Sequence, residues 1–387
     1  MKNKLLITSA LAAGSLMAGS IANAQTYYEK SNGYGQSTTT VGGDLAIIYS
    51  AFRKQNGTVT GGTSGLNSSR GFGRESQLNV SNRGKLNNGL DYAAGFSLEF
   101  DGRGASNTTS ATETPSISNE NVYVDLIVGN TTLTVGLDHV QRAYAGSVPA
   151  VFNITELMTA VGSKTTYVTG AKTSESAHVG IMQNIPSLGL KASAIYAPRS
   201  GDTGAEDVAS VTSNVTNNSS YEVGVIGVDA FGIKGLGVTG FYNSMARTNT
   251  TYYGTVKGVE YGASYNFGTV AIGFDKYKNE NGIASAATFN VLGEQANNAV
   301  ATTKKYGATY SLDANQTLGI VKSVTDTSGA AMNGLTETVV ALQYGYNFGP
   351  VAVSATASKF NNVYDAATGP TDQANGRMAQ LRVTTKF

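Results

Sequence analysis

Apolar and polar residues alternate along the segment SQLNVSNRGKLNNGLDYAAGFSLEF, which covers residues 76–100. The large apolar side chains fall on even positions both before and after Asn87-Asn88-Gly89, whereas the odd positions are polar or small. A period of two predicts a β-strand with one apolar and one polar face. Asn-Gly favours the positive φ that a short hairpin turn requires. The segment therefore predicts two long antiparallel strands joined by a tight turn.

The same alternation recurs to the end of the chain, and the links between alternating segments are short and long in strict turn. Seven links are tight turns, and eight are long and rich in Gly, Ser, Thr and Asn. These links join sixteen predicted strands, the first near residues 43–51 and the last at residues 377–387. The long links cover about residues 52–73, 101–118, 138–175, 197–220, 243–255, 275–302, 325–336 and 358–376.

Short links at one end of a sheet and long links at the other are typical of an up-and-down barrel in a membrane. Each unsatisfied backbone group costs several kcal/mol in hydrocarbon, so a spanning sheet must close and its first strand must pair with its last. A barrel of 16 strands is too wide for side chains to fill and encloses water. The predicted fold class is an all-β transmembrane up-and-down antiparallel β-barrel of about 16 strands.

The N-terminal sequence MKNKLLITSALAAGSLMAGSIANAQ predicts export. Lys2 and Lys4 precede a short apolar run, and Ala22-Asn23-Ala24 follows it, which is the order of a secretory signal. We expect residues 1–24 to be cleaved, leaving a single domain of residues 25–387. A retained membrane anchor fits less well because the apolar run is short and a small-residue site follows it.

Composition excludes several classes of protein. Charged residues make up 14% of the chain, compared with about 25% in ordinary soluble domains. Loss of Lys2 and Lys4 leaves 25 basic residues against 26 acidic residues, so no broad basic field for nucleic acid is present. The chain contains no Cys, which excludes disulfides and zinc–cysteine sites. No later stretch approaches the roughly 20 apolar residues of a spanning helix.

In its architecture the whole mature chain resembles the general diffusion porins of Gram-negative, proteobacterial outer membranes. The local resemblance is strongest in residues 76–100, in VYVDLIVGNTTLTVGLDHVQRAY and in the terminal LRVTTKF. It implies a water-filled channel for passive diffusion of small hydrophilic solutes and ions across the outer membrane, and no enzyme. It also implies a homotrimer in contact with membrane lipid and lipopolysaccharide. The barrel-assembly machinery of the outer membrane would read the last strand, which ends at Phe387.

The resemblance further implies that the third long link folds into the lumen and narrows it. Here that link is residues 138–175, and it departs from the acid-rich PEFGG-type loop of better-known members. In the family, acids on this loop face a basic cluster on the barrel wall. Strand alternation places Lys85, Lys191, Lys305 and Lys386 on the inward face. The candidate lining and constriction residues are Asp138, Arg142, Glu156 and Lys164 on the loop, and Arg382, Glu99, Asp125 and Arg83 on the wall.

Other functions are less favoured by the residues. A barrel enzyme needs a nucleophile beside a base, and the chain has only His139 and His178. The G-x-G-x-x-G match at residues 235–240 lies in a predicted hairpin without a following helix, which disfavours a dinucleotide site. We expect no cofactor, since the long links could hold Ca²⁺ but show no ligand spacing. A substrate-specific outer-membrane channel is the alternative, and an adhesin is less favoured. A sugar-specific channel would stack aromatic side chains along the pore, whereas most Tyr and Phe here alternate outward, as interface girdles do.

Overall fold

The structure, a computed structural model, describes residues 25–29, 37–56, 66–102, 116–137, 148–151, 177–198, 217–249, 252–280, 300–328, 335–364 and 373–387. The predicted signal segment lies outside these residues and stays a prediction. Within these ranges no helix is long and apolar enough to cross a membrane. The strands are β1 Gln25–Glu29, β2 Ser37–Asn56, β3 Leu66–Lys85, β4 Asp91–Gly102, β5 Ser116–Val128, β6 Thr131–Leu137, β7 Ala177–Ile185, β8 Leu190–Ala197, β9 Asn217–Val228, β10 Leu236–Asn249, β11 Tyr252–Asn266, β12 Val270–Glu280, β13 Val300–Ser311, β14 Gln316–Ser328, β15 Leu335–Phe348, β16 Val351–Tyr364 and β17 Gln373–Lys386.

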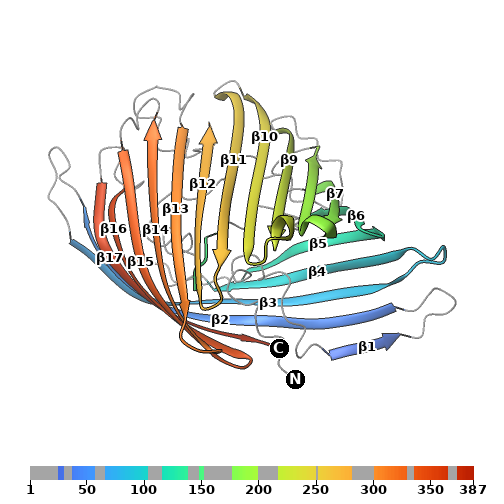
Figure 1. The fold of residues 1–387 in the computed structure, drawn as a ribbon, viewed down its shortest axis with the longest axis horizontal. Coiled ribbons are helices and arrows are strands. Elements are labelled where there is room, and N and C mark those ends of the chain that lie inside the picture. Colours follow the sequence, from blue (N-terminus) through green and yellow to red (C-terminus); the bar gives the residue numbers. More distant parts are fainter. Residues whose placement is uncertain are drawn as a thin grey trace.

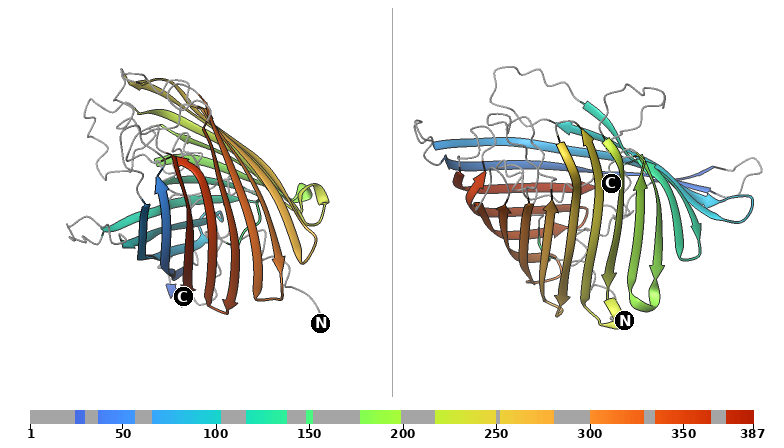
Figure 2. Two further views of the ribbon diagram at one scale, coloured as in Figure 1. Left: turned by 90° about the vertical axis from the view of Figure 1, so that its left-hand side faces the viewer. Right: turned by 90° about the horizontal axis from the view of Figure 1, so that it is seen from above.

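Strands β2 to β17 form one closed antiparallel sheet. Each strand pairs with the next along the chain, and β17 pairs with β2 from Ala374 opposite Asn56 to Lys386 opposite Asp44. In Figure 1, β10 to β16 stand nearly upright while β2 to β4 run across the view, as expected for tilted strands on opposite walls of a barrel. Figure 2 shows the sheet bending round on itself from two further directions. The predicted 16-stranded barrel is confirmed.

Strand β1 was not predicted from the sequence. It pairs with the beginning of β2, from Gln25 opposite Val41 to Glu29 opposite Ser37. Strand β17 covers the same edge of β2 only as far as Asp44, so β1 continues the line of β17 along this edge. Figure 1 places the C-terminus beside the start of β1. The extra strand pairs backbone groups that the long strand β2 would otherwise leave open.

The strands are longer than the alternation predicts, and one predicted long link is wrong. Residues 243–255 were expected to form a long connection, but β10 and β11 stay paired from Leu236 opposite Tyr265 to Asn249 opposite Tyr252. Only residues 250–251 separate the two strands. The error has a physical cause, since alternation reports only the part of a strand with one apolar face. Beyond that part polar and apolar residues no longer alternate, while the backbone ladder continues.

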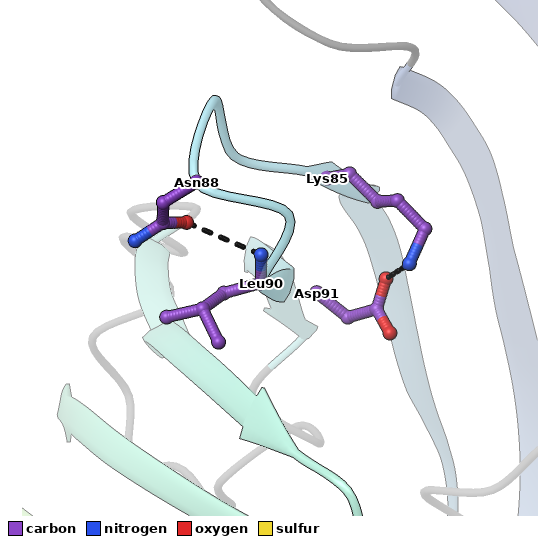
Figure 3. A network of polar contacts seen from close by, with 4 residues as sticks. All are labelled: Lys85, Asn88, Leu90 and Asp91. Atoms are coloured by element: carbon purple, nitrogen blue, oxygen red, sulfur yellow. Dashed lines mark hydrogen bonds and ion pairs between the residues drawn. The ribbon is translucent and has the colours of Figure 1, made fainter.

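The hairpin between β3 and β4 shows how the tight turns form. Gly89 has a φ of 84°, as the Asn-Gly signal predicts. The backbone N–H of Leu90 donates to Asn88 Oδ1 at 3.2 Å, and Lys85 Nζ lies 2.6 Å from Asp91 Oδ1 (Figure 3). Lys85 and Asp91 sit directly opposite each other at the end of the ladder. Local side-chain contacts therefore fix the register at this turn.

The two faces of the sheet differ as the alternation predicts. Outward apolar side chains such as Val124 and Val135 are 52% and 63% exposed, as side chains that meet lipid must be. Their inward neighbours, such as Thr134 on β6, are buried. A barrel with an apolar outside and a polar inside is the arrangement of a transmembrane strand set. The inward face of this barrel holds the candidate functional site.

Candidate functional site

Residues 148–151, a described part of the third long connection, lie inside the barrel against its wall. The backbone N–H of Val148 donates to Asp275 Oδ2 on β12 at 3.1 Å. The backbone N–H of Val151 donates to Gln343 Oε1 on β15 at 2.9 Å. Pro149 between them is buried. Two hydrogen bonds from the segment to the wall thus hold it across the inner surface of β12 to β15.

Three glycines on adjacent strands make room for this segment. A Cβ atom built on Gly307 of β13 would lie 2.3 Å from Val148 Cγ1 and 2.6 Å from the Pro149 carbonyl oxygen. On β14 and β15, Gly319 and Gly345 would place a Cβ 3.2 and 2.6 Å from Val151. Gly in a strand interior often marks the close approach of another backbone. The glycines therefore form the seat on which residues 148–151 lie.

A buried charged cluster lies beside the seat on β11 to β13. Glu260 pairs directly with Tyr277, and Asp275 pairs directly with Lys305, in the strand register. Lys305 Nζ lies 4.6 Å from the centroid of the Tyr277 ring. Glu260 and Asp275 are each 1% exposed. The cluster places two carboxylates and one ammonium group on the wall that carries the loop, with Asp275 shared between the cluster and Val148.

An apolar group also lies on the inner wall near the seat, although a porin-type lumen is expected to be polar. Phe360 and Met378 are almost completely buried, and Val148 and Ala150 pack against the group they belong to. The ring of Phe360 covers Gly376, where a Cβ would lie 2.4 Å from Phe360 Cζ. The remaining members are Val321, Val339 and Ala341, and Phe52 also packs against the group. This group gives the loop segment apolar contacts in addition to its two hydrogen bonds.

Arg382, a predicted lining residue, lies on the inner face of β17. Its Nη2 atom lies 3.3 Å from Glu75 Oε2 on β3, and its side chain is 8% exposed compared with 41% for that of Glu75. Lys386 and Asp44 lie directly opposite each other on the same face. Arg382 is therefore a covered, paired cation, and the carboxylate of Glu75 is the more accessible partner.

Arg83 and Asp125 come together around Tyr123. All three lie inward, and Tyr123 is the neighbour of both charged groups. Its ring covers Gly95, where a Cβ would lie 3.0 Å from Tyr123 Cε1. Asp125 Oδ1 accepts a hydrogen bond from Thr134 Oγ1 at 2.6 Å. These residues line the wall of β3 to β6, away from the seat of the loop segment.

The other wall candidates are placed as the alternation predicts. Glu99 lies opposite Gln77 in the register of β3 and β4, on the inward face. Lys85 pairs with Asp91 at the tight-turn end, and Lys191 lies opposite Asn184 at a similar level. His178 is inward and buried. The four loop candidates Asp138, Arg142, Glu156 and Lys164, and also His139, lie outside the described residues.

The residues that hold the loop could not be named from local sequence. The clearest signal lies in the glycines 307, 319 and 345, which alternate into the inward face of three neighbouring strands. Asp275 and Gln343 carry no such signal, because their partners lie 127 and 192 residues away along the chain. In the described part of the chain, no group of three or more His, Cys, Asp or Glu side chains could hold a metal ion.

A closed 16-stranded barrel with a chain segment seated inside its lumen defines the class of pore-forming barrels of outer membranes. A family model described as Gram-negative porin matches residues 8–364. The chain belongs to the Gram-negative porin family, lies in the outer membrane and forms a passive diffusion channel. No curated protein sequence is significantly similar to it.

Solved structures share the fold at low sequence identity. The anion-selective porin from Comamonas acidovorans is 13% identical, with a TM-score of 0.59 over 91% of this chain and 100% of that one. OmpF of Salmonella typhi, solved with daunomycin, is 14% identical, with a TM-score of 0.55 over 90% of this chain and 98% of that one. OmpT of Vibrio cholerae is 14% identical, with a TM-score of 0.54 over 93% and 100%. At such identities the likeness concerns the fold.

Proposed function

We propose that the channel passes small hydrophilic solutes and ions without chemical conversion, and that the third long connection sets its narrowest point. The observation that carries this proposal is the seat of residues 148–151 inside the closed barrel. A segment lying on one wall narrows the water-filled lumen without closing it. Selection then depends on the size and charge of the solute.

The proposal includes the assembly and partners of the channel. The barrel works as a homotrimer whose outer surface meets membrane lipid, lipopolysaccharide and neighbouring subunits. The barrel-assembly machinery recognises the last strand, which ends at Phe387. No cofactor, nucleic acid or catalytic step takes part. Asp138, Arg142, Glu156 and Lys164 remain the proposed loop residues of the constriction, and Glu99, Asp125, Arg83 and Arg382 its proposed wall residues.

Single-channel recording tests the proposal directly. Purified mature protein added to a planar bilayer should give stable, weakly selective conductance that increases in groups of three steps. Heat-denatured protein provides the control for leak. A silent bilayer with folded protein would contradict the channel. Block of the current by one sugar at low concentration would instead support a substrate-specific channel.

The trimer needs a separate measurement. Native gel electrophoresis and light scattering of the detergent-solubilised protein should give a mass of three chains plus detergent. A monomer with unchanged conductance would remove the trimer from the proposal and leave the channel intact.

Charge reversal at Glu156 should shift the ion preference, and an unchanged preference would remove that residue from the constriction.

A further inference from the structure

Tyr123 on β5 lies across the inner wall of the barrel, and Gly95 of β4 makes room for it. The two residues lie directly opposite each other in the strand register. A Cβ atom at Gly95 would lie 3.0 Å from both Tyr123 Cε1 and Tyr123 Oη, and 2.7 Å from the Val80 carbonyl oxygen. Gly in a strand interior often marks such a close approach. Tyr123 faces inward and is half-buried, so part of its ring borders the lumen.

A β-bulge in β5 adjoins Tyr123 on the side of the long connections. Between the pairs Gly95–Tyr123 and Ser97–Glu120, β5 holds one residue more than β4. Asn121 in the bulge has a φ of 52°, and its buried side chain donates a hydrogen bond from Nδ2 to Ser97 Oγ at 3.2 Å. Bulges increase the local twist, re-aim side chains and are frequent beside functional sites. The bulge and the glycine are two separate departures from a regular ladder, and both orient the same tyrosine.

Two opposite charges flank the ring on the side of the tight turns. Arg83 on β3 and Asp125 on β5 both lie opposite Ala93 of β4 in the register, and both are electrostatic neighbours of Tyr123. Two strand spacings separate them by about 10 Å at the backbone. Arg83 is exposed, and its long side chain can cover part of that span. The wall therefore presents a ring, a cation and an anion side by side.

These three groups stand across the lumen from the seat of residues 148–151. In the closed ring of β2 to β17, β4 and β12 are eight strands apart, and so are β5 and β13. The levels also agree, because Tyr123 lies five residues before the end of β5 at Val128, and Gly307 lies four residues before the end of β13 at Ser311. Both strand ends lead into tight turns. A solute that passes the loop segment therefore passes between it and the wall of Tyr123.

The three groups together select the kind of solute. A simple cation would be repelled by Arg83, and a simple anion would be repelled by Asp125. A neutral sugar would use neither charge. A solute with both charges and an aromatic ring matches all three groups, because aromatic rings stack on tyrosine, carboxylates pair with guanidinium groups, and ammonium groups are attracted to carboxylates and ring faces. This is the chemistry of an aromatic amino acid.

We propose that Tyr123, Arg83 and Asp125 form a solute-binding site at the level of the loop segment, and that its ligands are aromatic amino acids. The solute carboxylate pairs with Arg83, its ammonium group pairs with Asp125, and its ring stacks on Tyr123. The inference rests on the proposed function, since it requires an open lumen past residues 148–151. A site in a conducting pore must bind strongly enough to be occupied and weakly enough to release its solute.

The test measures the ion current through single channels of the mature protein in a planar bilayer. The probe is L-tryptophan, and the blank is L-alanine, which has the same two charges and no ring. Tryptophan should interrupt the current in brief, concentration-dependent events that alanine does not produce. Tyr123→Leu should weaken this block about twofold to tenfold, and Tyr123→Phe should retain it. The matched control is Tyr261→Leu on the outward face of β11, which should be blocked as wild type is.

A second pair of probes tests the charges. Arg83→Gln should weaken the block by tryptophan, but it should not weaken the block by tryptamine, which has no carboxylate. A merely structural role of Arg83 would change both blocks alike and would overturn its pairing with the solute. Equal block of wild type and Tyr123→Leu would remove the ring from the site. Block by glucose as strong as that by tryptophan would show a sugar site and would overturn the proposed ligand.

The current in KCl alone separates this inference from the proposed function. A silent wild type would overturn the channel and the site together, whereas an open channel that tryptophan does not block would overturn the site alone. If Tyr123→Leu does not fold, Asp125→Asn, which is nearly isosteric, should weaken the block by tryptophan. Unchanged block in that variant would then overturn the proposal.

Discussion

Gly43 and Phe387 exchange both of their backbone hydrogen bonds, at 2.8 and 3.0 Å, and thereby close the barrel at its last residue. The phenyl ring of Phe387 lies over Gly43, where a Cβ would come within 2.7 Å of Phe387 Cζ. An apolar C-terminal side chain is thus placed on the outer face at the tight-turn end, where aromatic girdles lie. The absence of a side chain at position 43 is what admits the ring.

Gly43→Ala should weaken barrel closure. The added methyl group would meet both the Phe387 ring and the Gln77 carbonyl oxygen, and such overpacking costs about 1–3 kcal/mol. Gly73→Ala is the matched control, because the nearest atoms to its Cβ are 4.0 Å away. Urea unfolding in lipid vesicles measures the difference. Equal stability of the Gly43→Ala and Gly73→Ala variants would contradict the packing of the Phe387 ring on Gly43.

Deletion of Phe387 should lower the yield of inserted barrel more than it changes conductance.

Gly307→Ala should displace residues 148–151 from the wall. The methyl group would collide with the Pro149 carbonyl oxygen, which is backbone and cannot rotate away. Single-channel conductance should therefore change, and the open-channel current should become noisier. Gly71→Ala on the inward face of β3 is the control, because nothing lies within 4 Å of its Cβ. If Gly307→Ala and Gly71→Ala had the same conductance, the seat of residues 148–151 would not set the width of the pore.

Gln343→Leu should loosen the same segment by a different route. The substitution leaves the Val151 N–H without its acceptor, and an unsatisfied buried donor costs about 1–3 kcal/mol. Gln380→Leu is the control, since Gln380 Nε2 instead contacts Ser50 Oγ at 3.2 Å. Limited proteolysis within the third connection should be faster in the Gln343 variant only. Equal rates in both variants would indicate that this hydrogen bond does not hold the loop.

The distribution of charge predicts a preference for cations. Among the residues with described side chains, ten basic and two acidic residues face outward, whereas six basic and nine acidic residues face inward. The outward basic residues are Arg53, Arg70, Arg74, Lys257, Lys276, Lys278, Lys304, Lys322, Lys359 and Arg377. Acids in excess around water favour cations. The reversal potential in a KCl gradient should therefore show faster K⁺ than Cl⁻ permeation.

Substitutions on the wall refine this prediction. Arg382→Gln removes the Arg382 cation from beside the accessible Glu75 carboxylate and should raise the K⁺ preference. Glu75→Gln should lower it, and outward Arg70→Gln should leave it unchanged. Faster Cl⁻ than K⁺ permeation by wild type would contradict the prediction. The Comamonas acidovorans porin is anion-selective, so the shared fold does not decide the sign.

Asp313 in the tight turn between β13 and β14 should make stability depend on pH. The backbone N–H of Asn315 donates a hydrogen bond to the Asp313 carboxylate, and so do the backbone N–H and the side-chain Nε2 of Gln316. These hydrogen bonds hold the pKa of Asp313 below its ordinary value of 3.8. Because the folded pKa is depressed, the stabilisation is present above pH 3.8 and is lost as pH falls through the lowered pKa. Asp313→Asn should be less stable than wild type at neutral pH and equally stable below that range. A difference that is constant with pH would contradict this cause.

Much of the barrel wall follows from local sequence. Alternation assigned Arg83, Asp125 and Arg382 to the inward face, and the strand register confirms that placement. The tight turn at Asn88-Gly89 was likewise readable, because positive φ is a local demand. Local patterns failed where the residue types show no period, as in residues 243–249 and 252–255, which still form strands. Strand β1 was missed for a related reason, since its pairing depends on how far β17 reaches along β2.

The sequence by itself determined the fold class. Along every strand of a membrane barrel, polar and apolar side chains must alternate, and both edges of every strand must be paired. Tertiary structure alone decided which wall receives the third connection. Val148 reaches Asp275, and Val151 reaches Gln343, across more than a hundred residues of chain. The same holds for Arg382 with Glu75. Such contacts arise only when closure brings distant strands to one surface, so no local period records them.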